Sequence, residues 1–265
     1  MDSLQLEVKG PAAVVRLNRP EQHNAINREL IAGLQQAFEE LGGRSETRVI
    51  VLTGGGPSFC AGADLGMMRA AAGNSYEANL EESQAIFDLM LAVDRCPKPV
   101  VGRINGSAFG GGVGLVCCCD LALTVEEALF AFSESRLGIV PAVISPFVLA
   151  KIGVSQARAL FLTGERFDAQ RAKAIGLVHE VVPAGGLDAA VAATVDQLLK
   201  AAPGAQAAAK ALIRDVAYRP AEEVAQLAAE LIAGRRASPE GQEGMAAFLE
   251  RRRPDWQSDA RQMDV

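Results

Sequence analysis

Three consecutive glycines, Gly110 to Gly112, are the residues of this sequence with the clearest chemical potential. An apolar run at 99–104, typical of a strand, precedes them, and small apolar residues, typical of a buried helix, follow. The first N–H groups of a helix have no partner within the helix and lie at the positive end of its dipole. Such a turn can hold an anion, or an oxygen that becomes one during a reaction. The alternative is a glycine-rich turn that only permits close packing.

A second loop of small residues, 54–65, also follows a strand-like run. If the N–H groups of Ala61 and Gly111 meet at one oxygen atom, they form an oxyanion hole built from the main chain alone. Such a hole suits a thioester carbonyl that becomes an enolate, and each donor would stabilise the transition state by about 3 kcal/mol. The two loops together therefore indicate chemistry on an activated acyl group.

Few side chains are available for acid–base chemistry. The sequence has two histidines, His23 and His179, so we expect neither a histidine-dependent triad nor a zinc site. It contains no P-loop, no dinucleotide-binding glycine fingerprint, no Gly-x-Ser-x-Gly elbow and no His-Glu-x-x-His motif. Glu134 is the candidate acid–base group, because a carboxyl in an apolar pocket has a raised pKa and exchanges a proton near neutral pH. The alternative for Glu134 is a solvated loop carboxylate.

Composition and charge are those of an ordinary globular protein. The chain has 265 residues, 49% of them hydrophobic, a net charge of −6 and a pI near 5.1. It has no long basic run, so we expect no nucleic-acid partner. No apolar run approaches the ~20 residues of a membrane span, and the N-terminus is not typical of a signal peptide. Five cysteines without a Cys-x-x-Cys pair favour buried thiols in a reducing compartment, so we expect a cytoplasmic protein.

Secondary-structure patterns place the two loops in a mixed α/β fold. Strands are expected at 6–8, 13–17, 49–53, 99–104, 120–125 and 177–182, and a short apolar run occupies 128–132. Helical periodicity follows Asn27, a candidate N-cap, and recurs at 80–93. From residue 143 onward the pattern is mainly helical, and Ser238-Pro239 is a helix-start signal. We expect a core over residues 1–200 and a helical C-terminal subdomain over residues 201–265.

Motifs along essentially the whole chain resemble those of the crotonase (enoyl-CoA hydratase/isomerase) superfamily. In order, they are Asn18-Arg19-Pro20, Asn24-Ala25, 59–65 (FCAGADL), 105–112 (NGSAFGGG), Asp120, 162–164 (LTG), 174–178 (AIGLV) and 241–250 (GQEGMAAFLE). More narrowly, 132–138 (FSESRLG) and 141–147 (PAVISPF) resemble bacterial 3-methylglutaconyl-CoA hydratases of leucine breakdown and their close relatives.

The resemblance implies a crotonase-like (ClpP/crotonase) spiral of ββα units with a helical C-terminal trimerisation subdomain, and a homotrimer or homohexamer. It implies an acyl-CoA thioester substrate, no metal, and no cofactor, because coenzyme A is part of the substrate. The thioester oxygen would be bound by the N–H groups of Ala61 and Gly111. The positions that match substrate or CoA contacts are Ala25, Ala63, Asp64, Leu65, Gly110, Gly112 and Pro141, and the CoA phosphates would meet basic residues near Arg19 and Arg28.

The sequence departs from the family at one position. Hydratases of this family commonly hold one water between two glutamates; the second matches Glu134, but the first corresponds to Gly114. Our leading expectation is hydration of a 2-enoyl-CoA, with 3-methylglutaconyl-CoA as a candidate substrate. The alternatives are an enoyl-CoA isomerase or another crotonase-type activity with a single glutamate, and a non-catalytic acyl-CoA-binding scaffold. Arg69, Arg95 and Arg136 are candidate partners for a second carboxylate on the substrate.

Overall fold

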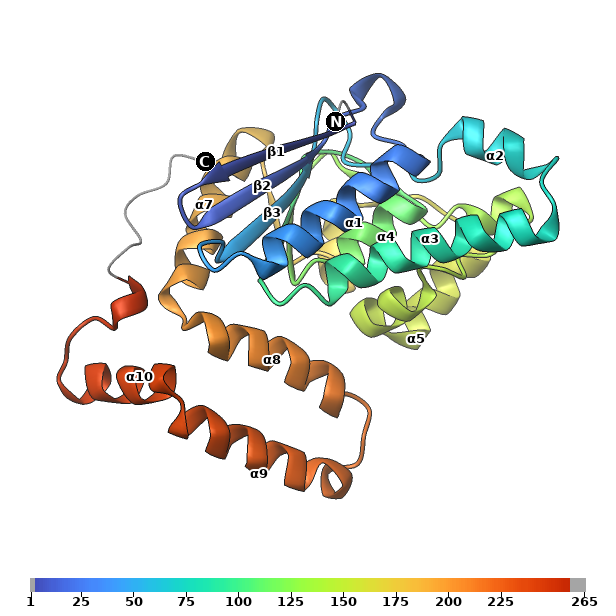
Figure 1. Ribbon diagram of the computed structural model, residues 1–265. Helices are drawn as coiled ribbons and strands as arrows, with labels where there is room; N and C mark the ends of the chain where they lie inside the picture. The colour runs from blue at the N-terminus through green and yellow to red at the C-terminus, as the bar shows by residue number, and fades with distance from the viewer. Residues whose placement is uncertain (1–2, 258–265) are drawn as a thin grey trace.

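A six-stranded sheet in the order β1-β2-β3-β4-β6-β9 forms the centre of the molecule (Figure 1). The computed structural model describes residues 3–257, so residues 258–265 of the predicted C-terminal subdomain lie outside the described part. The strands of this sheet are β1 (Leu4–Lys9), β2 (Ala12–Leu17), β3 (Val49–Gly54), β4 (Val100–Ile104), β6 (Leu121–Val125) and β9 (Glu180–Val182). β1 and β2 form an antiparallel hairpin, and the later neighbours pair in parallel.

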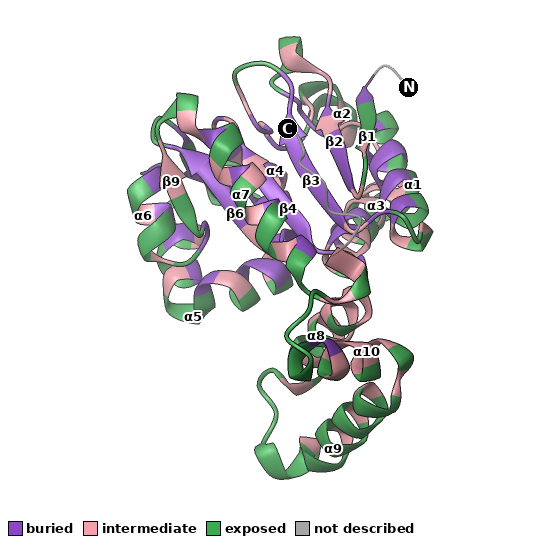
Figure 2. Ribbon diagram, turned by 90° about the vertical axis from the view of Figure 1, so that its left-hand side faces the viewer, coloured by how far each residue is buried: buried purple, intermediate pink, exposed green. Residues whose placement is uncertain are grey.

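Helices cover both faces of this sheet. α1 (Arg28–Gly43), α3 (Tyr76–Asp94) and α4 (Gly111–Cys118) lie on one face, and α7 (Leu187–Lys200) lies on the other (Figure 1 and Figure 2). Because it is covered on both faces, β3 is buried along its whole length, which explains its continuous apolar run. The predicted mixed α/β fold is confirmed.

A second, three-stranded sheet consists of β5 (Ala108–Phe109), β7 (Leu129–Ala131) and β8 (Phe167–Asp168). The rings of Phe130 and Phe167 stack with centroids 5.8 Å apart, and Phe132 meets Phe161 edge-on at 5.0 Å. These contacts fix the chain immediately before Glu134. The sequence indicated only an apolar run at β7 and did not predict β5 or β8, because such short strands show no clear period. The helix α6 (Ala169–Ala174) lies in the part of the chain where the pattern is mainly helical.

Capping residues set several helix boundaries. The remaining elements of the core are η1 (Pro20–Gln22), α2 (Leu65–Ala71), η2 (Glu134–Leu137), α5 (Ser145–Thr163) and η3 (Ala184–Gly186). The predicted N-cap Asn27 is confirmed, since its side chain accepts a hydrogen bond from the Leu30 N–H at 2.9 Å. The helix predicted at 80–93 begins earlier, at Tyr76, because Ser75 caps it by accepting from the Ala78 N–H.

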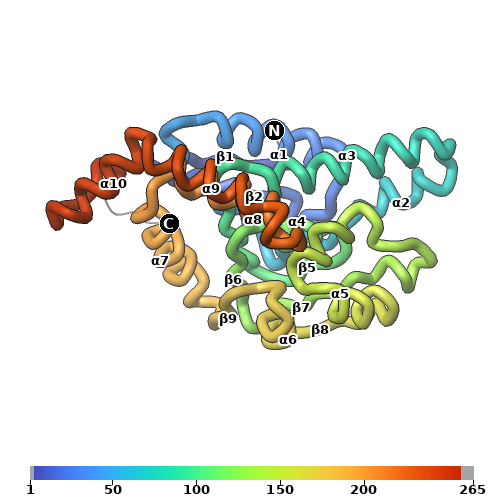
Figure 3. Tube along the Cα trace, turned by 90° about the horizontal axis from the view of Figure 1, so that it is seen from below, coloured from blue at the N-terminus to red at the C-terminus, as the bar shows by residue number. Residues whose placement is uncertain are grey.

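Three C-terminal helices form an arm that projects from the core (Figure 1 and Figure 3). They are α8 (Pro203–Val216), α9 (Ala221–Ala237) and α10 (Pro239–Leu249), followed by η4 (Asp255–Gln257). The side chain of Ser238 caps α10 as predicted. Figure 2 shows that most of the arm is exposed or only partly buried, in contrast to the core. Among the described helices, none is long and apolar enough to cross a membrane.

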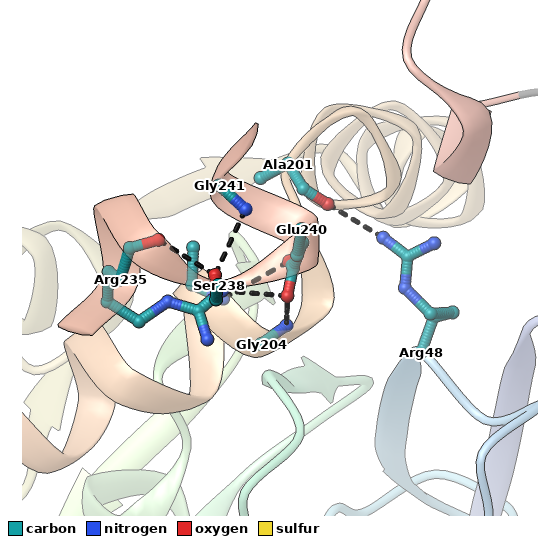
Figure 4. A network of polar contacts seen from close by, with 8 residues as sticks. Arg48, Ala201, Gly204, Arg235, Ser238, Glu240 and Gly241 are labelled. Atoms are coloured by element: carbon teal, nitrogen blue, oxygen red, sulfur yellow. Dashed lines mark hydrogen bonds and ion pairs between the residues drawn. The ribbon is translucent and has the colours of Figure 1, made fainter. Parts of the chain in front are cut away.

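Polar contacts hold the arm to itself and to the core. Figure 4 shows Glu240 accepting from the Gly204 N–H at 3.0 Å and from the Arg235 guanidinium at 2.7 Å, while Arg48 donates to the Ala201 carbonyl at 2.7 Å. On α8, Lys210 pairs with Asp120 at 2.7 Å. Asp120 also accepts from the Val100 N–H at 2.7 Å, so this ion pair joins the arm to the start of β4.

Replacing Lys210 by Met should destabilise the protein. The Lys210 side chain is 12% exposed, so its removal leaves a partly buried carboxylate without its cation, at a cost on the order of 2 kcal/mol. Lys9→Met is the matched control, because Lys9 pairs with Glu7 in an exposed setting and should cost less than about 0.5 kcal/mol. Urea unfolding of both variants measures the difference; equal losses of stability would contradict this role of Lys210.

Candidate active site

The first turn of α4 presents backbone N–H groups. Gly110 has a φ of +49°, which glycine adopts readily, and donates its own N–H to the Ala131 carbonyl at 2.9 Å. The Gly114 N–H bonds the Gly110 carbonyl at 3.1 Å and so begins the helical ladder. Within residues 3–257, no group accepts from the Gly111 N–H. Gly111 is half-buried, so this donor lies at the edge of the core, at the positive end of the helix.

Asn24 holds the second loop, residues 54–65, in place. Its side-chain amide donates to the carbonyls of Gly55 and Ser58 at 2.8 and 2.9 Å, and its carbonyl oxygen accepts from the Arg19 N–H at 2.9 Å. Asn24 is fully buried, so these bonds are not exchanged with water. The loop is therefore fixed from one side before any substrate binds.

The two loops touch through their backbones. The Phe109 N–H donates to the Cys60 carbonyl at 3.0 Å. A Cβ atom at Gly62 would lie 2.6 Å from the Phe109 carbonyl oxygen and 3.5 Å from the Gly111 nitrogen, and one at Gly112 would lie 2.2 Å from the Cys60 carbonyl oxygen. Only glycine permits this approach. The Gly62–Ala63 peptide and the Gly110–Gly111 peptide are consequently neighbours.

Ala61 is not the second free donor. Its N–H donates to the His23 carbonyl at 2.9 Å, so it is already used inside the protein. The prediction that Ala61 binds the thioester oxygen is wrong for this reason. Sequence reasoning could not detect the bond, because it depends on how the chain at His23 folds back onto the loop.

Ala63, two residues further on, has the free N–H group. Ile26 donates to the Gly62 carbonyl at 2.7 Å and accepts from the Asp64 N–H at 3.0 Å, as in a parallel bridge. In such a bridge the Ala63 N–H points away from Ile26. No group in the described chain accepts from it, and Ala63 is exposed. The two alanines are separated by a turn at Gly62, whose φ is +88°. Ala61 uses its N–H inside the protein, whereas within the described residues Ala63 does not.

Glu134 lies against the same glycines. Its Oε1 atom is 3.1 Å from the place where a Cβ of Gly110 would be. Its Oε2 atom is buried and has no hydrogen-bond partner among the described residues. Burial raises the pKa of the Glu134 carboxyl above its ordinary value of 4.5, although a hydrogen bond with its own backbone opposes this shift. Glu134 is therefore not a solvated loop carboxylate, and it is suited to proton transfer.

Gly114 faces hydrocarbon. A Cβ at this position would lie 2.4 Å from Cγ2 of Ile144 and 3.2 Å from Cε of Met90. Ile144 ends the turn between η2 and α5 that contains the buried Pro141. The structure thus places an apolar side chain at the position where the resemblance implied a carboxylate. Sequence reasoning identified Gly114 but not Ile144, since the contact joins distant segments.

The other predicted binding residues lie around these groups. Asp64 caps α2 through the Gly66 N–H and pairs with Arg19 at 2.9 Å, and Arg19 also donates to the Ala25 carbonyl. Arg19 is therefore committed to holding this loop. Leu65 begins α2 and is exposed. Arg28 is mostly exposed beside Glu82, where a phosphate could reach it.

The two histidines and the cysteines have structural surroundings. Nδ1 of His23 is 2.9 Å from the Ser58 hydroxyl, and Nδ1 of His179 accepts from the Ala122 N–H at 3.0 Å. The five cysteines are buried and free, as the sequence indicated. Burial raises the pKa of Cys60 to about 12, so this thiol, although next to the site, is not a nucleophile.

Comparison with known proteins identifies relatives over nearly the whole chain. Residues 7–259 match the model of the enoyl-CoA hydratase/isomerase family. An enoyl-CoA hydratase of Alternaria alternata is 40% identical over 211 residues, which is 78% of this chain and 69% of the fungal one.

Solved structures give the same result. An enoyl-CoA hydratase from Shewanella pealeana is 38% identical, with a TM-score of 0.93 over 96% of both chains. An enoyl-CoA hydratase/isomerase from Marinobacter aquaeolei is 35% identical, with a TM-score of 0.91 over 97% of this chain and 99% of that one. The chain therefore has the crotonase fold and belongs to the enoyl-CoA hydratase/isomerase family of enzymes.

Proposed function

We propose that this enzyme adds water to the double bond of a 2-enoyl-CoA thioester. The observation that carries the proposal is the pair of backbone donors, Ala63 N–H and Gly111 N–H, which lie on neighbouring peptides beside Glu134 and, like its buried Oε2 atom, have no hydrogen-bond partner among the described residues. The thioester oxygen would accept from both N–H groups. Negative charge that develops on this oxygen is then stabilised by donors that are already oriented.

Glu134 would carry both proton transfers. Its carboxylate takes a proton from water while the hydroxide forms a bond to the β-carbon and the thioester becomes an enolate. The carboxylic acid then gives the proton to the α-carbon, which restores the double bond of the thioester carbonyl and the carboxylate. One water is consumed, and its H and OH are added to adjacent carbons. The raised pKa of Glu134 suits it to both halves of this cycle.

Isomerisation of an enoyl-CoA is a second candidate, favoured by the apolar surroundings of Gly114. With Ile144 and Met90 at this position, a second carboxylate does not face the reacting carbons from α4. Glu134 could instead remove a proton from the carbon next to the thioester carbonyl and return it two carbons further along the chain. This reaction consumes no water and passes through a dienolate, whose oxygen would accept from the same two N–H groups. Mass analysis distinguishes the products, because only hydration adds 18 mass units, about the mass of one water.

For the acyl group, we propose 3-methylglutaconyl-CoA as the first substrate to test. Its second carboxylate needs a cation, and Arg136 lies on η2, the same short element as Glu134. The Nε atom of Arg136 donates to the Thr163 carbonyl at 3.0 Å, which holds the side chain in one place. Arg136→Met should lower kcat/KM for 3-methylglutaconyl-CoA by about tenfold or more while crotonyl-CoA, which lacks the second carboxylate, is affected less than about twofold. Equal effects on both thioesters would exclude Arg136 as the partner.

We also propose that the protein works in the cytoplasm as a homotrimer or a homohexamer. Free buried cysteines are typical of a reducing compartment. On the arm, Ile213, Phe248 and Leu249 are exposed, and large exposed apolar side chains favour contact with another subunit. Light scattering of the purified protein would give three or six times the chain mass of 27.8 kDa.

Replacing Glu134 by Gln should abolish turnover and increase stability. We expect kcat to fall by about 10³-fold because the acid–base group is lost, while binding of an acyl-CoA persists. The folded state holds the Glu134 proton more tightly than the unfolded state does. This contribution to stability is therefore present below pH 4.5 and lost as pH rises through the raised folded pKa. At pH 7 the variant should melt above the wild type, and near pH 4 the difference should vanish.

Calorimetric titration with acyl-CoA separates catalysis from binding in the same pair of proteins. Wild type that binds an acyl-CoA but turns over neither 2-enoyl nor 3-enoyl thioesters would support the scaffold alternative instead. Full activity of Glu134→Gln would contradict the proposed mechanism.

The pH dependence of turnover should follow the Glu134 carboxylate. The ionised form accepts the first proton, so kcat/KM should fall on the acid side with an apparent pKa above 4.5. A pH–rate profile with crotonyl-CoA measures this limb. An acid limb at or below the ordinary value would assign proton transfer to another group.

Replacing single backbone N–H groups by ester oxygens tests the oxyanion hole. With the α-hydroxy analogue of alanine at position 63, kcat should fall by about 10²- to 10³-fold, since one donor to the developing oxyanion is lost. The matched control is the same change at position 61, which removes only the bond to the His23 carbonyl and should cost less than about tenfold in kcat. The reverse order of effects would restore Ala61 as the donor.

A further inference from the structure

Two side chains from elsewhere pack against the start of α4. The Gly114 N–H bonds the carbonyl of Gly110, the N-cap, so the two glycines lie one turn apart in the chain. Glu134 approaches Gly110, and Ile144 approaches Gly114. The Glu134 carboxyl and the Ile144 side chain therefore lie against neighbouring positions at the start of this helix.

Hydrocarbon fills the place next to Gly114. Ile144 is 1% exposed and Met90 is fully buried. The Cγ2 atom of Ile144 stands where the first atom of any side chain at position 114 would have to be. Because Cβ is shared by every residue except glycine, the contact excludes all other residues unless Ile144 moves.

The lack of a second acceptor matters for water. An ordered water in a protein needs two to four polar partners. The Glu134 carboxylate can accept one of its hydrogens, whereas the aliphatic carbons of Ile144 can accept none. Water beside Glu134 is therefore held less firmly than it would be between two acceptors, while removal of a proton from a substrate carbon needs no ordered water.

We propose that Ile144 is a specificity-determining residue: it fills the place next to Gly114 with hydrocarbon, keeps a second carboxylate out of that place, and thereby lowers the ratio of hydration to isomerisation below that of a site with two carboxylates. The inference rests on the proposed function, since it concerns the ratio of hydration to isomerisation at the same active site. It assigns to Ile144, a residue in the turn before α5, control over the ratio of the two reactions.

A cycle of small substitutions tests the packing. Gly114→Ala should lower the melting temperature because its Cβ meets Ile144, and Ile144→Ala should lower it by leaving a cavity. The melting temperature of the double variant should be about 2–4 °C higher than the value obtained by adding the two single shifts, since each change relieves the other. Strictly additive shifts would overturn the claim that Ile144 occupies this space. This readout does not depend on any activity.

A second carboxylate at position 114 tests whether Ile144 controls the ratio of the two reactions. In Gly114→Glu/Ile144→Ala, the ratio of crotonyl-CoA hydration to 3-butenoyl-CoA isomerisation should rise by about tenfold or more relative to wild type. Gly114→Gln/Ile144→Ala has nearly the same shape without the charge and should not show this rise. A folded Glu double variant whose ratio matches that of the wild type or of the Gln control would overturn the proposal.

A failure of the proposed function can be distinguished from a failure of the inference about Ile144. A wild type that turns over neither thioester would overturn it, and the control of the reaction by Ile144 with it. The melting cycle would still decide whether Ile144 occupies the space in front of Gly114.

Discussion

The close contact between two stretches of backbone, 60–62 and 109–112, constrains the rest of the structure. A Cβ atom at Gly112 would clash with the Cys60 carbonyl, and a Cβ atom at Gly62 would clash with the Phe109 carbonyl. Neighbouring peptides can present N–H groups to one oxygen only if nothing larger than hydrogen separates them. This contact explains why both loops consist mainly of small residues. It also explains why each loop needs rigid support behind it.

That support comes from side chains behind one loop and from strand pairing behind the other. Asn24 and Arg19 bind one loop from the side, and the pairing of β5 with β7 holds the other. The backbone donors are thereby oriented before the reaction, so little reorganisation is needed when charge develops. Arg19 was a candidate phosphate ligand on sequence grounds. Its ion pair with Asp64 shows that it serves to hold the loop.

Glu134 has a cost that the rest of the fold offsets. Its Oε2 atom is buried and has no hydrogen-bond partner among the described residues, so the ionised carboxylate destabilises the folded state. The aromatic cluster around Phe132, directly before η2, buries enough apolar surface to hold the segment in place. The burial of Glu134 thus lowers stability while it raises the pKa of the carboxyl, and the packing of neighbouring side chains offsets the loss of stability.

Sequence patterns predicted the features that depend on local chemistry. The Asn27 cap, the buried face of α1 and the glycine turn before α4 all follow from residues close in the chain. They did not predict which of two alanines keeps a free N–H, because the His23 carbonyl that binds Ala61 lies 38 positions earlier in the chain. Nor could they predict that Ile144 lies against Gly114. Both facts depend on pairs of segments that meet only after folding.

The helix α4 connects the site to the arm. Its first turn supplies the Gly111 donor, and at its other end Lys151 donates to the Cys119 carbonyl at 2.7 Å, a favourable place for a cation. The next residue, Asp120, pairs with Lys210 of the arm. The helix is buried apart from its first residue, so it has little room to shift within the core. The ion pair with Lys210 therefore connects the arm to the same rigid element that presents the Gly111 N–H.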